Sequence, residues 1–151
     1  MNVVIMGSGR IGGTLANSLS NEGHSVSIID ISTHSFDRYL DSDFRGQTIL
    51  GDGIDEDILR EAGIERADAF IACARGDNHN LMASQIAKVM FNVKRVVCRC
   101  NDAVRAEIYE DVGLVTVSPS RLAADGLRAA LMDDDRHTRD VAASISQLLV
   151  R

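Results

Sequence analysis

The sequence is poor in several residue types, and each shortage excludes a class of protein. It has no tryptophan, one proline and three cysteines among 151 residues. Cys73, Cys98 and Cys100 are odd in number and lie in apolar runs, so we expect reduced thiols in a cytoplasmic protein rather than a disulfide-stapled secreted one. Acidic residues outnumber basic ones by 22 to 16, for a net charge of −6, and no basic tract occurs. Nucleic acid is therefore disfavoured as a partner.

Long apolar runs are missing as well. No uninterrupted run approaches the ~20 residues that a membrane-spanning helix requires. The first six residues, Met-Asn-Val-Val-Ile-Met, include no basic leader, so we expect no secretory signal. The remaining composition is that of a globular protein, with 45% apolar and 25% charged residues. This length and composition predict one domain with a full core.

Short β-branched runs alternate with helical periods along the chain, which predicts βαβ units around a parallel sheet. The expected strands are Val3–Met6, Ser25–Asp30, Gln47–Leu50, Ala69–Ala74, Arg95–Cys100 and Leu114–Val117. Five helices are expected between them. The first carries Ile11, Leu15 and Leu19, and the second lies near His34–Leu40. The others are expected near Ile58–Ala62 (capped by Gly63), near Asn78–Phe91 and over Val104–Val112. The predicted fold is an α/β, doubly wound Rossmann fold with a six-stranded parallel sheet in the order 3-2-1-4-5-6.

The pattern changes after Pro119, where we expect extra C-terminal helices. One helix is marked by Leu122, Leu127 and Leu131, and a second, after the acidic run 133–135, by Val141, Ile145, Leu148 and Leu149. We expect residues 1–132 to form the Rossmann domain and 133–151 to form a hinge and an amphipathic helix. One apolar stripe can close over its own sheet, but two exceed what such a domain needs. The stripes therefore predict at least a homodimer.

A glycine motif follows the first predicted strand and opens an amphipathic helix. Gly7-Ser8-Gly9-Arg10-Ile11-Gly12 matches G-x-G-x-x-G. In this motif Gly7 allows a tight turn, Gly9 lets the backbone approach a pyrophosphate, and Gly12 lets helix and strand pack closely. The helix N-terminus would offer unpaired amides and a favourable dipole to phosphates. The alternative is a glycine turn in an empty Rossmann domain, but the context favours a dinucleotide or adenine-nucleotide site.

Asp30 ends the second predicted strand, 18 positions after Gly12. A carboxylate there can accept hydrogen bonds from the ribose hydroxyls of an adenosine. It would repel a 2′-phosphate, so NADP is disfavoured. It does not distinguish NAD(H) from ATP or ADP, because all of these carry a free 2′-hydroxyl. Its alternative role is that of a helix or turn cap.

Further polar residues follow the third and fourth predicted strands. Asp52 lies in Gly51-Asp52-Gly53, and Asp77 and Asn80 lie in the segment after Ala74. Taken singly, Asp52 could be a turn residue and Asp77 a helix N-cap. Together they place polar groups at neighbouring strand ends, where ligands of such folds bind. The functional and the structural interpretation are about equally favoured here.

These motifs, with the segments Asp77–Asn80 and Cys98–Asn101, resemble the N-terminal nucleotide-binding subdomain of the RCK (regulator of potassium conductance) family, also called TrkA-N, over roughly residues 1–132. The resemblance implies that the glycine loop binds phosphates, Asp30 the ribose, and the neighbourhood of Asp52 the adenine. It also implies that Arg10 faces phosphates, often across a subunit contact, and that Arg99 is the family's arginine at the end of the fifth strand. The residues predicted to bind the nucleotide are Gly7, Ser8, Gly9, Arg10, Ile11, Gly12, Asp30, Ile31, Asp52, Gly53, Ala74, Arg75, Asp77, Asn80 and Arg99.

The resemblance implies a cytosolic regulatory subunit that binds NAD(H) or ATP/ADP and controls a membrane potassium transporter or channel. Its expected partners are the nucleotide, the membrane subunit, which would hold it at the inner face of the membrane, and further copies of itself. Family members usually continue into a C-terminal subdomain, whereas this sequence stops at Arg151. It is therefore expected to be either a shortened chain or a lone nucleotide-binding subunit.

An NAD-dependent oxidoreductase, or its cofactor-binding fragment, is the alternative function. Such an enzyme needs a substrate domain and a positioned acid–base group. His79 is the best acid–base candidate, but its place near a helix start favours a structural role. About 30 residues follow the last strand, too few for a catalytic domain. No residues have metal-site spacing, so we expect a sensor rather than an enzyme.

Overall fold

A computed structural model of the chain describes residues 1–111 and 113–132. Residues Met1–Val117 form one compact unit, and a second unit begins at Ser118. The predicted hinge and final helix, residues 133–151, lie outside the described residues, and the predicted boundary after residue 132 stays a prediction. No described helix combines the length and the apolar character needed to cross a membrane.

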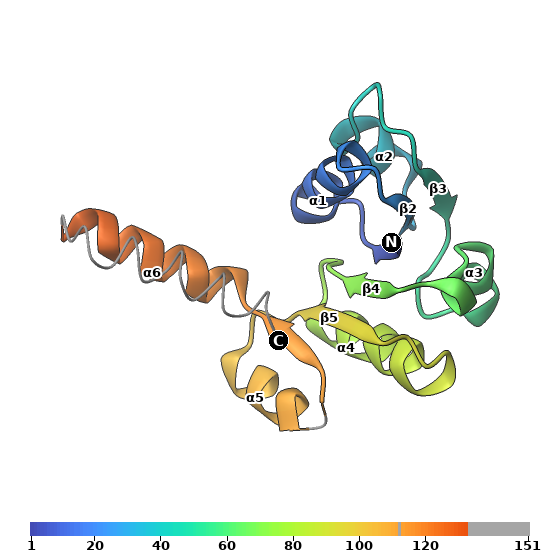
Figure 1. The fold of residues 1–151 in the computed structure, drawn as a ribbon. Helices are drawn as coiled ribbons and strands as arrows, with labels where there is room; N and C mark the ends of the chain where they lie inside the picture. Colours follow the sequence, from blue (N-terminus) through green and yellow to red (C-terminus); the bar gives the residue numbers. More distant parts are fainter. Residues whose placement is uncertain (112, 133–151) are drawn as a thin grey trace. The chain divides into compact units, whose positions relative to one another are not determined.

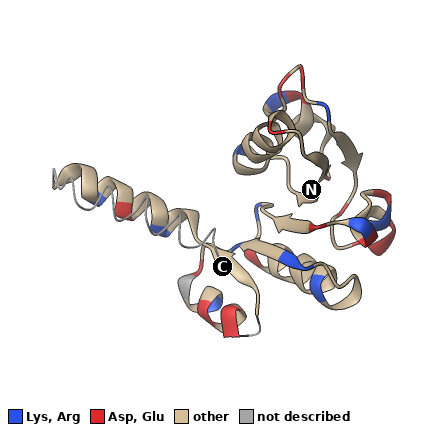
Figure 2. Ribbon diagram, in the orientation of Figure 1, with Lys and Arg blue, Asp and Glu red and all other residues tan. Residues whose placement is uncertain are grey.

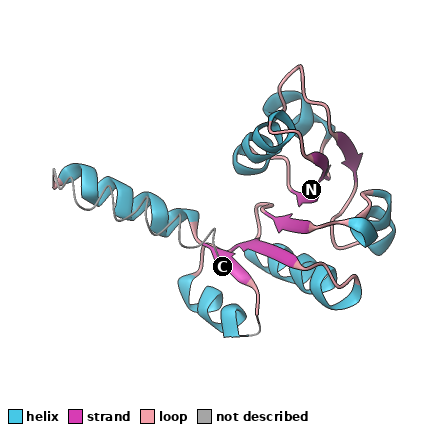
Figure 3. Cartoon of the chain, viewed as in Figure 1, coloured by secondary structure: helices cyan, strands magenta, loops and turns pink. Residues whose placement is uncertain are grey.

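The first unit is built on a six-stranded parallel sheet whose order is β3-β2-β1-β4-β5-β6 (Figure 1, Figure 3). The strands are β1 (Asn2–Met6), β2 (Ser25–Asp30), β3 (Gln47–Leu50), β4 (Ala69–Ala72), β5 (Arg95–Arg99) and β6 (Val115–Val117). The predicted fold class and strand order are confirmed. The predicted bounds of β2 and β3 are confirmed, whereas those of the other four strands were wrong at one end by a residue or two, most of all for β4, which ends at Ala72 rather than Ala74.

Helices connect the strands along the sequence. They are α1 (Arg10–Asn21), α2 (Thr33–Tyr39), α3 (Glu56–Glu61), the 3-10 turn η1 (Ile64–Arg66), α4 (Asp77–Gln85), the π-helical turn η2 (Ile86–Met90) and α5 (Ala103–Asp111). The second unit begins with α6 (Pro119–Leu131). The single helix predicted over Asn78–Phe91 is thus an α-helix that widens into a π turn. Gly63 follows α3 in the left-handed conformation, at φ +80°, as the predicted cap requires.

Both faces of the sheet are covered, because successive side chains of each strand point to opposite faces. On β1, Val4 and Met6 join the core cluster that includes Leu59 of α3, while Val3 and Ile5 join the cluster that includes Ala16 of α1. The helices that fill the first face are α3 and α4, and those that fill the second are α1 and α2. The sheet therefore lies between two helical layers.

The carboxyl ends of the central strands lie side by side. Met6 of β1 is paired with Ile29 of β2 on one side and with Ala72 of β4 on the other, and Asp30 is paired with Leu50 of β3. The loops that follow these four strands consequently meet at one edge of the sheet. The strand order reverses between the neighbouring strands β1 and β4, and ligands of doubly wound sheets bind at such a point.

Candidate functional site

The glycine loop joins β1 to α1 in a conformation that its glycines permit. Gly7 has φ +101°, and a Cβ there would lie 2.6 Å from the backbone nitrogen of Ala74. Its own N–H donates to the carbonyl oxygen of Ile29 at 2.8 Å. A Cβ at Gly12 would overlap the carbonyl oxygen of Gly7 and approach Cys73 Sγ to 2.9 Å. Gly7 therefore provides the turn and Gly12 the close approach of α1 to the sheet, as the motif predicts.

Gly9 differs from these two glycines, because its surroundings are open. It is the N-cap of α1, with φ −85° and ψ −165°, and no heavy atom lies within 4 Å of the position that a Cβ would take. No side chain caps this helix end, and its first turn holds no acidic residue. The N-terminus of this twelve-residue helix thus has amide groups that no side chain caps. Such a terminus is suited to binding a phosphate.

Asp30 binds the glycine loop directly. Its Oδ2 accepts a hydrogen bond from the Ser8 backbone N–H at 2.7 Å, and its Oδ1 accepts one from the Ser32 N–H at 2.9 Å. The carboxylate therefore ties the end of β2 to the loop after β1. Each carboxylate oxygen can accept further bonds, so the arrangement leaves acceptor capacity for ribose hydroxyls. The neighbouring Ile31 is 76% exposed and offers an apolar surface beside the carboxylate.

Asp52 lies in a tight turn after β3 that contacts the end of β1. The Ile54 N–H donates to Asp52 Oδ1 at 3.2 Å, and the Asp55 N–H donates to the Asp52 carbonyl at 3.0 Å. A Cβ at Gly53 would overlap the side chain of Met6, so this glycine allows the turn to sit against β1. The structural interpretation of Asp52 as a turn residue holds, and it also places the carboxylate at the ligand edge of the sheet.

Asn80 and Arg99 organise the loop after β4. Asn80 is fully buried and donates from Nδ2 to the carbonyl oxygens of Ala74, at 2.9 Å, and Arg99, at 3.0 Å. Arg99 Nη1 donates to the same Ala74 oxygen at 3.0 Å. Two of these bonds hold the Ala74 carbonyl, next to the point where Gly7 meets the Ala74 backbone, and the third ties Asn80 to the end of β5. Asn80 and Arg99 thus fix the position of the loop after β4.

The predicted alternative role of Asp77 as a helix N-cap was wrong. Gly76 is the N-cap of α4, and Asp77 is its first helical residue. The Asp77 carboxylate instead accepts hydrogen bonds from the backbone N–H groups of Asn101, at 2.9 Å, and Asp102, at 3.1 Å. It therefore connects the start of α4 to the loop after β5, a link that spacing along the sequence does not reveal.

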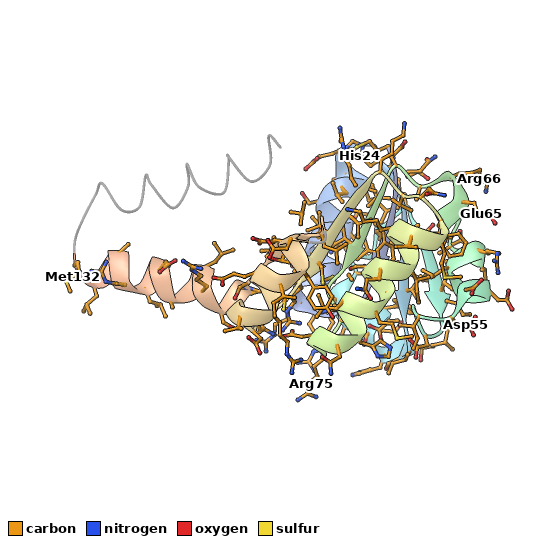
Figure 4. The ribbon with its side chains drawn as sticks, turned by 90° about the horizontal axis from the view of Figure 1, so that it is seen from below. His24, Asp55, Glu65, Arg66, Arg75 and Met132 are labelled. Carbon is orange, nitrogen blue, oxygen red and sulfur yellow. The ribbon has the colours of Figure 1, made fainter. Side chains whose placement is uncertain are left out.

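The cationic side chains of the site are exposed. Arg10 lies in the first turn of α1, and Arg75 lies in the loop between β4 and α4, where Figure 4 shows it at the surface. Neither forms an ion pair with a described residue. Acidic residues gather on α3 instead, with Glu56, Asp57 and Glu61 (Figure 2). Two cations therefore remain available beside the glycine loop.

Some buried polar atoms of the site have no hydrogen-bond partner among the described residues, and these are Ser8 Oγ, Asn80 Oδ1 and Arg99 Nε. Such atoms are uncommon in folded proteins, because each one costs desolvation energy. All three belong to residues that the sequence predicts to bind a nucleotide, whereas a fourth such atom, Ser84 Oγ of α4, does not. Hydrogen bonds to a polar ligand or to ordered water would satisfy these atoms.

The three cysteines are free and buried. Burial raises the pKa of the Cys73 thiol from 9.0 to about 12, although the Arg99 guanidinium opposes that rise. Burial also raises the pKa of Cys98 to about 11. Both thiols are therefore protonated at neutral pH and unsuited to nucleophilic chemistry. Among the described residues no group of three or more His, Cys, Asp or Glu side chains could hold a metal ion.

One residue pair of the site was missed by sequence reasoning. His79, in the first turn of α4, donates from Nε2 to Asp52 Oδ1 at 2.7 Å. The two residues are 27 positions apart, and no motif links them. The sequence signal for this pair is that Asp52 and His79 each follow a strand whose carboxyl end lies at the same edge of the sheet.

Comparison with known proteins places the chain in a family. The TrkA-N domain matches residues 3–119. The Trk system potassium uptake protein TrkA of Streptomyces coelicolor is 46% identical over 132 residues, which are 87% of this chain and 59% of the relative. A TrkA homolog of Pyrococcus abyssi is 34% identical over 131 residues, covering 83% of this chain and 57% of the relative. The chain thus spans less than three fifths of the length of these relatives.

Solved structures share the fold. The C-terminal domain of Shewanella denitrificans Kef, in its AMP-bound form, is 21% identical with a TM-score of 0.75, and the match covers 99% of both chains. The RCK domain of GsuK is 25% identical with a TM-score of 0.75, and the match covers 88% of this chain and 28% of that one. The resemblance to the RCK family is confirmed by these matches. With most of its length matched, the chain belongs to the TrkA-N domain family.

Proposed function

We propose that the chain is a nucleotide-binding regulatory domain that controls a membrane-embedded potassium transporter or channel. One observation carries the nucleotide part of the proposal. The uncapped N-terminus of α1 opens at Gly9, and the carboxylate of Asp30 binds the same loop through the Ser8 N–H at 2.7 Å. This pairing offers backbone amides to phosphates and a carboxylate to a ribose, two groups that adenine nucleotides carry together.

The proposed ligand is NAD(H) or ATP/ADP, with NADP(H) disfavoured. A 2′-phosphate would meet the Asp30 carboxylate, and like charges at such short range repel. Arg10 and Arg75 are exposed cations that can bind phosphate oxygens. Support also comes from related folds, since the Kef domain is described in an AMP-bound form and GsuK in a form bound to ADP.

The proposed partner is a potassium transporter or channel subunit, which would hold the chain at the cytoplasmic face of the membrane. The support is the identity of relatives that act in Trk potassium uptake, together with the likeness to the RCK domain of the GsuK channel. In this role nucleotide binding alters the arrangement of the regulatory subunits, and that change acts on the membrane protein.

The nucleotide part is tested by thermal-shift titration of the purified chain with ADP, ATP, NADH and NADPH, and by mass spectrometry of any ligand released from it. We expect stabilisation by at least one of the first three and little or none by NADPH. Stabilisation by NADPH alone would refute the proposal. Potassium uptake, measured in cells carrying the membrane subunit with either wild-type chain or Gly9→Val, tests the regulatory part, and equal uptake would refute it.

We propose a sensor rather than an NAD-dependent oxidoreductase. Burial raises the pKa of the Cys73 and Cys98 thiols, so both are protonated at neutral pH and are poor nucleophiles. The expected result is that NADH incubated with the chain is recovered unchanged. Oxidation of NADH at a rate proportional to the concentration of the chain would favour the enzyme instead.

A further inference from the structure

A hydrogen bond crosses the ligand edge of the sheet from the helical layer to the turn after β3. His79 Nε2 lies 2.7 Å from Asp52 Oδ1, and both side chains are half-exposed, at 45% and 42%. His79 belongs to α4, which follows β4, whereas Asp52 follows β3. Since β2 and β1 lie between these two strands in the sheet, the bond links loops that are not neighbours in the strand order.

The bond determines which oxygen of Asp52 remains available. Oδ1 accepts two hydrogen bonds, one from His79 Nε2 and one from the Ile54 N–H. Oδ2 accepts no hydrogen bond from a described residue. The turn itself is fixed by the Asp55 N–H and by the contact of Gly53 with Met6, so the remaining freedom of Asp52 is rotation of its carboxylate. His79 restricts that rotation.

The fold does not depend on this bond. The start of α4 is already anchored by Asp77, which accepts from the Asn101 and Asp102 N–H groups, and by the buried Asn80, which bridges two loop carbonyls. A pair of half-exposed side chains adds little to stability, because water competes for both groups. A bond of small structural value at the ligand edge is therefore best explained by a role in the site.

We propose that His79 is a positioning residue of the nucleotide site, which holds Asp52 so that Oδ2 faces the adenosine part of the ligand. The inference rests on the proposed function, because it assumes an adenine nucleotide at this edge. His79 acts through Asp52 and need not touch the ligand. It also couples ligand binding to α4, since a ligand that engages Oδ2 stabilises the rotamer that His79 binds.

A double-mutant cycle in the full chain tests this inference, with ADP and NADH as probes in isothermal titration calorimetry. We expect His79→Ala to weaken binding by about threefold to tenfold, in the range of coupling between contacting groups. In the Asp52→Ala background the same substitution changes affinity by less than about twofold. His79→Gln, whose amide can donate to the same oxygen, restores most of the affinity. Asn78→Ala is the control, because Asn78 lies in the same turn but binds Arg105.

The outcomes separate this inference from the proposed function. An equal loss of affinity from His79→Ala in the wild-type and Asp52→Ala backgrounds would mean that His79 does not act through Asp52. Tighter binding by His79→Ala would mean that the His79 side chain competes with the ligand. Either result, or unchanged affinity, overturns the role of His79 while the nucleotide site stands. Failure of both probes to bind the wild-type chain overturns the proposed function and this inference with it.

Discussion

The substitution Gly9→Val separates folding from ligand binding at the glycine loop. The backbone of Gly9 is extended, at φ −85° and ψ −165°, and no heavy atom lies within 4 Å of the position of an added Cβ. The fold should therefore tolerate valine, at a cost of about 1 kcal/mol or less for a poorer N-cap residue. That cost corresponds to a fall in melting temperature of roughly 4 °C or less for a domain of this size.

The ligand should not tolerate valine, because the same open space is where a phosphate must approach the amides of α1. Displacing the phosphate by the width of a methyl group breaks the hydrogen bonds that it accepts. If two charge-assisted bonds of about 1.5–3 kcal/mol are lost, affinity falls by about a hundredfold or more. Isothermal titration with ADP and NADH measures this loss, and thermal unfolding measures the cost to the fold.

Gly126→Val is the control, since Gly126 of α6 also has no heavy atom within 4 Å of its Cβ position and lies outside the candidate site. It should leave the affinity within about twofold of the wild type, a change of less than about 0.5 kcal/mol. If Gly9→Val binds ADP and NADH as tightly as this control does, the glycine loop is not the phosphate site.

Four further predictions follow from the same structure. Gly12→Ala should prevent stable folding, because its Cβ would overlap the Gly7 carbonyl oxygen; circular dichroism showing a wild-type melting curve would contradict this. Asp30→Ala should weaken the binding of ADP and NADH by about tenfold to a hundredfold in the same titration, since hydrogen bonds to a charged acceptor worth about 1.5–3 kcal/mol are lost; unchanged affinity would show that Asp30 does not contact the ribose. The contribution of Cys73 to stability should be constant below pH 9 and should fall by at most about 4 kcal/mol as the pH rises towards 12, because the Cys73 pKa is raised from 9.0 to about 12 in the folded chain only; denaturant unfolding of Cys73→Ser should therefore show a smaller fall than the wild type over this range, and an identical fall would contradict this account. Light scattering should give at least twice the chain mass of 16.4 kDa, and the substitutions Leu127→Asp and Leu131→Asp, at side chains that are 74% and 80% exposed, should lower that mass; a wild-type monomer would refute the interface.

The sequence predicts the sheet well because strand and helix periods are properties of local segments. Val3–Met6 and Ser25–Asp30 are β-branched runs, and connections in parallel sheets leave few possible orders. The predicted end of β4 was wrong for a physical reason. Cys73 and Ala74 continue the apolar run, but they pack against the glycine loop rather than extend the strand, and apolar character alone does not distinguish these two kinds of burial.

The candidate site was predictable where one motif contains the whole interaction. The roles of Gly7 and Gly12 follow from their spacing, because the turn and the helix they serve are adjacent in sequence. The bonds of Asp77 to the loop after β5 and of His79 to Asp52 join segments 24 to 27 residues apart. Such bonds depend on the exact register of strands and helices, which periodicity fixes only to within a few residues.

The central claim is that Asp30 and the glycine loop bind an adenine nucleotide with a free 2′-hydroxyl. The most direct test is a paired calorimetric titration of the chain with NADH and NADPH, which differ only at that hydroxyl, alongside ADP and 2′-phospho-ADP. The account predicts that the 2′-phosphorylated member of at least one pair binds more than about tenfold more weakly, a difference of about 1.4 kcal/mol or more. Equal or tighter binding of the 2′-phosphorylated member in both pairs would contradict it.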